Sequence, residues 1–377
     1  MIEFDCGQPS YILANSRIKI AITVQGGHLR ACFPHRGGQA SPFFVAPWWN
    51  EAPIGGEEPI IQVLRGDFFC LPFGANSETC QGVKYPVHGS TANGGWQLDS
   101  LQEEQREPSI ALSMPVYGGG RVVKRVRLQD EAAVLYCEHR ISGLSGRMPL
   151  GHHAVLQFPE AEGSGIIDMS EPLAGFTAPA PIEEPAKGGY SLLKPGAVIE
   201  DPHRAPTVYG DTVDLLRYPS RDGYEDVALF VSDPARAFCY SCVTLPGEGY
   251  LYFQLKDPRV LAETLFWRSN GGRHYPPWSG RVRHVLGLEE VTSYFAYGVK
   301  PSVEANPLQE RGFKTFVELS GERPLTVRVI MGCVPIPDGF SGVRDVSRRD
   351  STSIQITGRG GEELAVSCRL DFLQRGF

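Results

Sequence analysis

Two adjacent histidines, His152 and His153, stand at the start of an apolar segment that ends at Gln157. A segment of this kind predicts a β-strand, in which neighbouring side chains point to opposite faces. Only one of the two imidazoles can therefore face a given cavity. Histidine is a common metal ligand and also transfers protons near neutral pH. Because the chain has neither a His-Glu-x-x-His motif nor paired Cys-x-x-Cys motifs, we expect no metal at this position.

Two adjacent carboxylates, Glu289 and Glu290, interrupt a second apolar segment, residues 286–294. A carboxylate inside an apolar strand must be partnered or used in chemistry, because its burial is costly. The two side chains again face opposite ways, so one of them should point inward. An inward glutamate beside a histidine is the pair that general acid–base catalysis requires. The alternative is an edge strand on which both carboxylates are solvated.

Two turn-rich loops carry the polar and aromatic residues that a sugar site would use. Sugar sites combine charged or amide groups that bind hydroxyl pairs with an aromatic face that packs against the C–H side of the ring. The first loop, residues 65–96, contains Arg65, Asn76, His88 and Trp96, and the second, residues 267–278, contains Trp267, Arg268, Arg273, His274 and Trp278. The alternative for both loops is that these side chains only stabilise their own turns.

The elements that must position these residues are predicted to be strands. Gly (43) and Pro (30) make up about a fifth of the 377 residues, well above the roughly 12% of average usage, which indicates many turns. The apolar segments between the turns are short and alternate or run for five to eight residues, as strands do. The best helical candidate, residues 257–266, is brief and fits a turn followed by a strand equally well. The pattern predicts an all-β fold, a large antiparallel sandwich, and the lack of a fixed repeat disfavours a propeller.

Two segments stand apart from this pattern. Residues 178–206 are rich in Pro and small residues and are expected to form a long surface excursion, either a lid or a plain loop. We therefore expect a main β-sandwich domain over residues 1–335 and an appendage over residues 336–377. In the appendage, alternating stretches at residues 352–357 and 364–372 flank a Gly-rich turn and predict a β-hairpin packed on the main domain.

Composition excludes several classes of function. Lys and Arg total 36 against 43 Asp and Glu, a formal net charge of -7, so no basic stripe is expected to bind nucleic acid. No apolar run is long enough to span a membrane, and acidic residues stand where a leader peptide would carry Lys or Arg. The nine cysteines are an odd number in mostly apolar runs, and the thiols of Cys239 and Cys242 would face opposite sides of one strand. We expect reduced thiols, a cytoplasmic location, and a monomer or homodimer.

In their order along the chain, these short motifs resemble those of the galactose mutarotase-like superfamily of aldose 1-epimerases, and most closely those of its hexose-6-phosphate 1-epimerase branch. The resemblance covers residues 17–330, and the family places a catalytic histidine at a strand start, as at His153, and a glutamate after an apolar strand, as at Glu289. The other matching motifs are Gly26-Gly27-His28, Arg65-Gly66-Asp67, Leu71-Pro72-Phe73-Gly74, His88-Gly89 and Trp96.

The resemblance implies a β-supersandwich whose cleft binds a small-molecule sugar without a cofactor or metal. It implies that Glu289 is the general base for the anomeric hydroxyl and that His153 protonates the ring oxygen. Arg65 and His88 would hold the sugar. The further substrate contacts expected from it are Asn76, Trp96, His152 and Trp267.

Two departures from the family pattern bear on the substrate. The phosphate-binding branch has arginines between its His-Gly and its Trp, whereas residues 90–95 here contain no cation. Because phosphate recognition depends on Arg or Lys, we expect an unphosphorylated aldose or sugar derivative. The proline usual after the catalytic glutamate is Glu290 here.

Two other functions remain open from the sequence. One is a carbohydrate-binding protein that kept the cleft and lost turnover. The other is a lyase or glycosidase, for which hydrolysis needs a second carboxylate about 5 to 10 Å from the first. Glu225 and Asp226 are the candidates for that second acid. Further candidates for a hydroxyl ligand are Asp211, Asp214 and Asp222.

Overall fold

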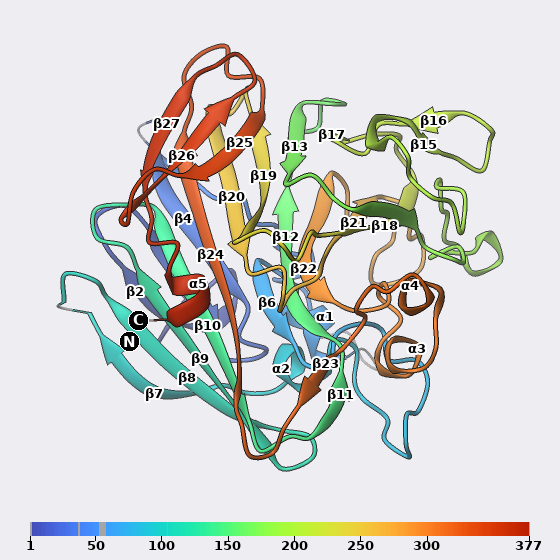
Figure 1. Ribbon diagram of the computed structural model, residues 1–377, viewed down its shortest axis with the longest axis horizontal. Coiled ribbons are helices and arrows are strands. Elements are labelled where there is room, and N and C mark those ends of the chain that lie inside the picture. The colour runs from blue at the N-terminus through green and yellow to red at the C-terminus, as the bar shows by residue number, and fades with distance from the viewer. Residues whose placement is uncertain (1, 37, 53–57, 104, 377) are drawn as a thin grey trace.

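Two large antiparallel β-sheets lie face to face in the computed structural model, which describes residues 2–36, 38–52, 58–103 and 105–376 (Figure 1). Among these residues the first sheet has 11 strands. In spatial order they are β1 (Ile2–Asp5), β2 (Gln8–Ala14), β3 (Lys19–Thr23), β4 (Leu29–His35), β6 (Asp67–Cys70), β12 (Leu150–Gln157), β22 (Val285–Thr292), β21 (Glu263–Asn270), β18 (Tyr224–Val231) and β14 (Ala174–Thr177), with β5 (Gly38–Ala40) paired to β4.

The second sheet covers one face of the first and has 9 strands among the described residues. In spatial order they are β17 (Arg217–Tyr218), β13 (Gly165–Met169), β19 (Cys239–Leu245), β20 (Tyr250–Lys256), β24 (Leu325–Pro335), β10 (Val134–Ser142), β9 (Gly120–Leu128), β8 (Ser109–Val116) and β7 (Gln97–Gln102). The predicted all-β sandwich is therefore confirmed.

Hydrophobic periodicity explains which strands have a solvated face. In β9, burial alternates along the strand, because one face lies on the core and the other meets water. In β12 and β22 nearly every residue is buried. These two central strands are covered on both faces, by the second sheet on one side and by loops on the other.

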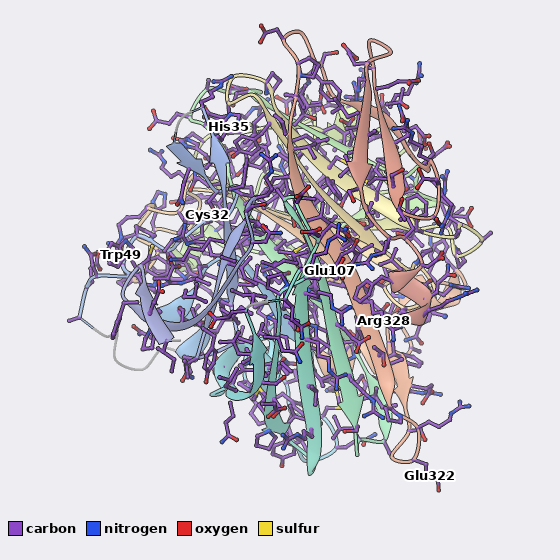
Figure 2. All side chains as sticks on the ribbon, turned by 90° about the vertical axis from the view of Figure 1, so that its left-hand side faces the viewer. Cys32, His35, Trp49, Glu107, Glu322 and Arg328 are labelled. Carbon is purple, nitrogen blue, oxygen red and sulfur yellow. The ribbon has the colours of Figure 1, made fainter. Side chains whose placement is uncertain are left out.

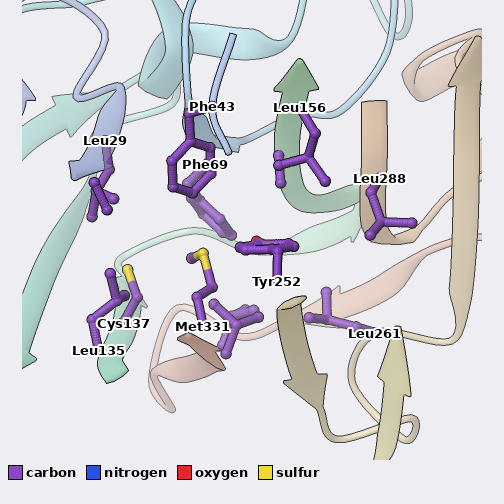
Figure 3. Close-up of a cluster of buried hydrophobic side chains, with 14 of the residues drawn as sticks. Leu29, Phe43, Phe69, Leu135, Cys137, Leu156, Tyr252, Leu261, Leu288 and Met331 are labelled. Atoms are coloured by element: carbon purple, nitrogen blue, oxygen red, sulfur yellow. The ribbon is translucent and has the colours of Figure 1, made fainter. Parts of the chain in front are cut away.

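The main hydrophobic core fills the space between the two sheets. Leu29, Phe69 and Leu288 of the first sheet meet Leu135 and Met331 of the second there, as Figure 3 shows. Both faces that enclose this core are therefore fixed by close packing, which holds the central strands rigidly.

Short helices and small sheets connect these layers. Residues 257–266, the best helical candidate of the sequence, form a turn that leads into β21. No helix in the described part of the chain is long and apolar enough to cross a membrane. The remaining elements are α1 (Pro59–Val63), α2 (Gly89–Asn93), α3 (Val299–Val303), α4 (Pro307–Glu310), the 3-10 helices η1 (Pro185–Lys187) and η2 (Pro202–Arg204), and the paired strands β11 (Gly146–Met148) with β23 (Val317–Leu319) and β15 (Ala205–Pro206) with β16 (Thr212–Val213).

The excursion over residues 178–206 lies beside β18 and β21, on the right of Figure 1. One buried carboxylate holds it in place: Asp226 of β18 accepts hydrogen bonds from the backbone N–H groups of Leu192 and Leu193, at 2.9 and 2.8 Å. The segment is thus a fixed wall of the molecule with its own contacts to the first sheet.

The C-terminal segment forms a three-stranded sheet, where the sequence predicted a two-stranded hairpin. Its strands are β25 (Val343–Arg348), β26 (Ser353–Gly358) and β27 (Glu363–Ser367), and α5 (Phe372–Arg375) follows where we expected β27 to continue. The hairpin of β26 and β27 is confirmed. The strand β25 was missed because a β-bulge between Val343 and Asp345 breaks the alternation, so that its buried residues Val343 and Val346 are three positions apart.

This C-terminal sheet packs on the outer face of the second large sheet. Its buried residues, including Ile354 and Ile356, share a cluster with Tyr136 and Phe253. Glu107 pairs with Arg369 of the segment, and Figure 2 shows Glu107 and Arg328 on this outer face. The separation into a domain over residues 1–335 and an appendage stays a prediction.

Candidate active site

Strand register brings His153 and Glu289 together on the outer face of the first sheet. His153 of β12 lies directly opposite Glu289 of β22 and opposite Phe68 of β6. Directly paired residues of antiparallel strands point to the same face, so all three side chains project away from the sandwich core. His152 and Glu290 are paired in the same way and project into the sandwich interior.

The His153 and Glu289 side chains contact each other directly. Nε2 of His153 lies 3.2 Å from Oε1 of Glu289, and both side chains are almost completely buried. Nδ1 of His153 and Oε2 of Glu289 have no hydrogen-bond partner among the described residues. Each group therefore keeps one polar atom available for a ligand.

Aromatic rings fix the orientation of the His153 imidazole. Phe68 stacks on it with ring centroids 4.5 Å apart, and His28 stacks on the far side of Phe68 at 4.2 Å. The edge of Trp267 approaches from another direction, at 5.8 Å. A ring packed against Phe68 and Trp267 keeps one rotamer, which preorganises the pair.

A glycine leaves room for the carboxylate. Gly287 lies two residues before Glu289 on the same face of β22, and a Cβ there would come within 2.4 Å of Oε1 of Glu289. The same Cβ would also approach the Trp267 side chain, at 2.9 Å. The lack of a side chain at Gly287 therefore leaves space for both the Glu289 carboxylate and the Trp267 side chain.

Burial shifts the pKa of both members of the pair toward their neutral forms. Burial raises the pKa of Glu289 well above its ordinary value. Burial, with smaller contributions from His88 and His28, lowers the pKa of His153 well below its ordinary value. Charge on either group is costly in this environment unless the other group or a ligand compensates it.

His88 adds a neutral hydrogen-bonding group to the same pocket. Its Nδ1 accepts a hydrogen bond from the backbone N–H of Gly74 at 3.3 Å, and its ring lies 4.9 Å from that of His153. Burial, with a smaller contribution from Arg273, lowers the pKa of His88 to about 3. With Nδ1 accepting and the ring neutral, Nε2 carries the proton and is a donor.

The pocket around these groups has a volume of about 320 Å³ and mostly apolar walls. Trp267 and Trp278 form one wall, and Pro181 and Ile182 of the excursion form another. The other lining residues are Ile60, Ile61, Leu64, Phe68, Ala75, Val87, His88, His153, Val227, Leu265, Arg273, Glu289, Ala296 and Tyr297.

Arg273 is the one cation among the described residues that line the pocket. Its Nε donates to Oε1 of Glu183 at 2.7 Å, and its guanidinium lies 3.9 Å from Oε2 of Glu225. It also packs on the faces of Trp267 and Trp278, at 5.5 and 4.5 Å. Two carboxylates thus neutralise its charge, and Glu183 ties the excursion to the pocket.

Arg65 does not reach this pocket, which corrects its expected contact with the sugar. Its buried guanidinium donates to the backbone carbonyls of Val63, Asp5 and Cys6. These bonds tie β1 to the loop before β6. The Arg65 side chain is buried and donates to these backbone carbonyls, so it stabilises the fold.

Trp96 and His152 also lie away from the pocket, as a correction to the expected contacts. Trp96 is part of the main core and donates from Nε1 to the carbonyl of Thr91. His152 faces the sandwich interior, where Nδ1 lies 2.9 Å from Oδ2 of Asp67. The strand alternation that sends His153 outward requires this inward position.

Asn76 stands beside the pocket and shapes its loop. Its amide group donates to the carbonyls of Gly74 and Pro86 and accepts from the backbone N–H of Val299. Its polar atoms are thus engaged by protein, while its neighbour Ala75 lines the pocket. Of the eight predicted residues, the structure brings His88, His153, Trp267 and Glu289 together in the pocket.

The other acidic candidates have partners elsewhere. Glu225 accepts hydrogen bonds from Nε1 of Trp267 and from the hydroxyl of Ser269, at 2.9 and 2.6 Å, and therefore supports the pocket wall from behind. The exposed Asp211 and Asp222 pair with Arg221 and Arg283, and the half-buried Asp214 pairs with His203. These contacts occupy the carboxylates that a second catalytic acid or a further hydroxyl ligand would use.

Sequence reasoning missed the roles of Arg273, Glu183 and Phe68. Arg273 stood in the predicted aromatic and basic loop, and that composition was the available signal. Its partner Glu183 lies 90 residues away in the excursion, and no local pattern connects the two. Phe68 could have been found only by knowing the register of β6 with β12.

Comparison with solved structures identifies the architecture. A candidate aldose 1-epimerase from Escherichia coli K12 aligns with a TM-score of 0.56 at 14% identity, over 87% of this chain and 99% of the other. The chain has a galactose mutarotase-like fold. A galactose mutarotase related enzyme from Lactobacillus acidophilus aligns with a TM-score of 0.56 at 12% identity, over 87% of this chain and 98% of the other.

A third mutarotase-like structure, from Clostridium acetobutylicum, gives a TM-score of 0.55 at 11% identity, over 89% of this chain and 98% of the other. No protein-family model and no curated protein matches the sequence. The mutarotase-like fold confirms the architecture that the sequence motifs predicted, and a fold alone does not define an activity.

Proposed function

We propose that the protein is an aldose 1-epimerase-like isomerase that interconverts the anomers of an aldose or sugar derivative. The observation that carries the proposal is the contact between His153 and Glu289 inside a pocket with mostly apolar walls. The hydroxyl and the ring oxygen of an aldose share one carbon, so the two groups that exchange their protons must lie close together. This pair meets that condition.

The reaction moves two protons and no heavy group. Glu289 takes the proton of the anomeric hydroxyl, and the electrons of that O–H bond form the second bond of the aldehyde C=O. The bond from C1 to the ring oxygen breaks, and the ring oxygen takes a proton from His153. Rotation about the C1–C2 bond presents the other face of the aldehyde, and the reverse transfers close the ring and restore both groups.

The environment suits a pair that exchanges a single proton. Burial disfavours the carboxylate of Glu289 and the imidazolium of His153 alike. One proton shared by the two groups keeps the pair neutral overall. A sugar bound at the atoms without partners, Oε2 of Glu289 and Nδ1 of His153, can give a proton to Glu289 and accept a proton from His153. General acid and base catalysis of this kind contributes about 10²- to 10⁴-fold each.

The remaining pocket groups would orient the sugar. The neutral N–H of His88 can donate to a hydroxyl or to the ring oxygen. The faces of Trp267 and Trp278 can pack against the C–H side of a ring. These contacts bind without taking part in the proton transfers.

The charge distribution favours an unphosphorylated substrate. Arg273 already has Glu183 and Glu225 as partners, so no uncompensated cation among the described lining residues awaits a phosphate. Residues 90–95, at α2 and its C-terminal end, contain no Lys or Arg. Phosphate recognition generally depends on such residues.

The test is a panel of freshly dissolved single anomers of hexoses and pentoses, followed by polarimetry with and without the protein. Phosphorylated sugars are followed by exchange NMR in parallel. Acceleration with an unphosphorylated aldose, above the rate with its phosphate ester, supports the proposal. Binding of sugars without acceleration would instead identify a carbohydrate-binding protein.

A further inference from the structure

A second cluster of polar side chains lies on the interior side of the strands that carry the pocket. It consists of Cys137 and His139 of β10 and His152 of β12, and one potential ligand atom of each lies within 4.8 Å of the others. All three residues are buried. We propose that Cys137, His139 and His152 form a structural metal site that binds a single Zn²⁺ ion between the two sheets.

Strand geometry places the cluster across the sandwich. Cys137 and His139 are two residues apart on β10, so both side chains point from the second sheet toward the first. His152 points from the first sheet toward the second, opposite to its neighbour His153. Figure 3 shows Cys137 among the core residues that fill this interior. An ion held by these groups would cross-link the sheets at their centre.

Hydrogen bonding leaves the cluster incomplete without a ligand. Nε2 of His139 and Nε2 of His152 are buried and have no hydrogen-bond partner among the described residues. Buried polar atoms in proteins are generally paired, so two such nitrogens in one cluster indicate a missing partner. The Sγ of Cys137 lies 4.0 Å from Nδ1 of His139, which leaves the sulfur only a weak contact there.

Asp67 prepares His152 to bind a metal. Its Oδ2 lies 2.9 Å from Nδ1 of His152, and the Asp67 carboxylate is fully buried. An imidazole that donates from Nδ1 to a carboxylate presents the lone pair of Nε2, and metal-binding histidines commonly have such a partner. Oδ1 of Asp67 has no hydrogen-bond partner in the described part of the chain.

The donor set and its dimensions suit zinc. One thiolate and two imidazoles are ligands that Zn²⁺ binds in proteins. An ion at the centre of three atoms that lie within 4.8 Å of one another is at most about 2.8 Å from each. Zn–S and Zn–N bonds of about 2.3 and 2.0 Å therefore need inward shifts of at most about 0.5 to 0.8 Å. Binding releases the thiol proton of Cys137 to solvent, and the thiolate and Asp67 together balance the charge of the ion.

The absence of a local motif explains why the sequence predicted no metal at His152. Cys137 and His139 belong to a different sheet from His152. Only the packing of the two sheets brings the three residues together. The site is separate from the proposed catalytic pair, which projects from the other face of β12.

The test uses the full chain refolded from denaturant with Zn²⁺ or Co²⁺, because the cluster is closed to solvent in the folded protein. After removal of free metal, we expect about one metal ion per chain by elemental analysis and a thiolate-to-cobalt charge-transfer band with Co²⁺. Cys137→Ala and His139→Gln should reduce bound metal at least about tenfold, whereas Cys242→Ala, at a buried thiol outside the cluster, should not.

Several results would overturn the proposal. One is wild-type protein that refolds in the presence of either ion and holds no stoichiometric metal. Another is a cobalt complex without the charge-transfer band, and a third is metal retained by Cys137→Ala. If that variant does not fold, the wild-type metal content and cobalt spectrum decide alone. None of these readouts depends on isomerase activity, so the metal site and the proposed function can fail independently.

Discussion

His153 and Glu289 face each other across neighbouring antiparallel strands, with Nε2 of the histidine 3.2 Å from Oε1 of the glutamate. The register of β12 with β22 fixes this contact, and the stacked rings of Phe68 and His28 support it from below. The proposed chemistry thus depends on backbone pairing in the middle of a rigid sheet, where small changes of position have large effects on proton transfer.

Gly287→Ala should reduce activity and cost about 1 to 3 kcal/mol of stability, because the new Cβ would also lie 2.9 Å from the Trp267 side chain. The new Cβ would lie within 2.4 Å of Oε1 of Glu289 and must displace the carboxylate from His153. We expect kcat to fall about 100-fold, since general acid–base catalysis accounts for roughly that much. Gly247→Ala is the matched control, because a Cβ there has no neighbour within 4 Å. Unchanged kcat in Gly287→Ala would show that the exact carboxylate position is unimportant.

Glu183→Gln should weaken substrate binding by loosening the excursion. The change removes the charge that pairs with Arg273 and weakens the contact with the hydroxyl of Tyr275. Charge-assisted hydrogen bonds contribute about 1.5 to 3 kcal/mol, so we expect KM to rise about tenfold with kcat nearly constant. The neighbouring Glu184→Gln, at an exposed pair with Lys187, provides the control. Equal KM values in the two variants would contradict a binding role for the excursion.

Glu225→Gln should change how stability depends on pH. Burial is the main cause that raises the pKa of Glu225 to about 7, from an ordinary value of 4.5. Between pH 4.5 and 7 the folded protein keeps a proton on Glu225 that the unfolded chain has released. The contribution of Glu225 to the free energy of unfolding is therefore fully present below pH 4.5 and is lost as the pH rises through 7.

Urea unfolding between pH 4.5 and 8 measures this effect. The wild-type free energy of unfolding should fall by about 3 kcal/mol more than that of Glu225→Gln across the window, the amount that corresponds to the shift. Glu78→Gln, at an exposed pair with Lys300, should leave the wild-type slope unchanged. Parallel curves for wild type and Glu225→Gln would show that the carboxyl is not buried as described.

The family resemblance singled out His153 and Glu289. Local pattern was enough to predict the strands of the sandwich and the opposite facing of His152 and His153 and of Glu289 and Glu290. Each of these follows from alternation along one strand, which the sequence records directly. Arg65 and Trp96 show where this reasoning ends: their residue types suit a sugar site, but three backbone carbonyls and the main core engage them instead. Which face of a loop residue meets a cavity depends on packing between segments far apart in the chain.

For the same reason the sequence did not predict the contact of Glu183 with Arg273 or that of His152 with Asp67. In both cases the partners come from different elements, and no spacing rule connects them. The oligomeric state, the cytoplasmic location and the unphosphorylated substrate stay predictions.

The most direct test of the central claim is a double-mutant cycle on anomer exchange, measured by NMR with the preferred sugar. The variants are Glu289→Gln, His153→Asn and the double substitution, with thermal unfolding to show that each is folded. If the two groups exchange protons as one unit, each single variant should lose about 10²- to 10⁴-fold and the double variant should lose little more. Retained exchange in folded Glu289→Gln, or losses that multiply in the double variant, would contradict the account.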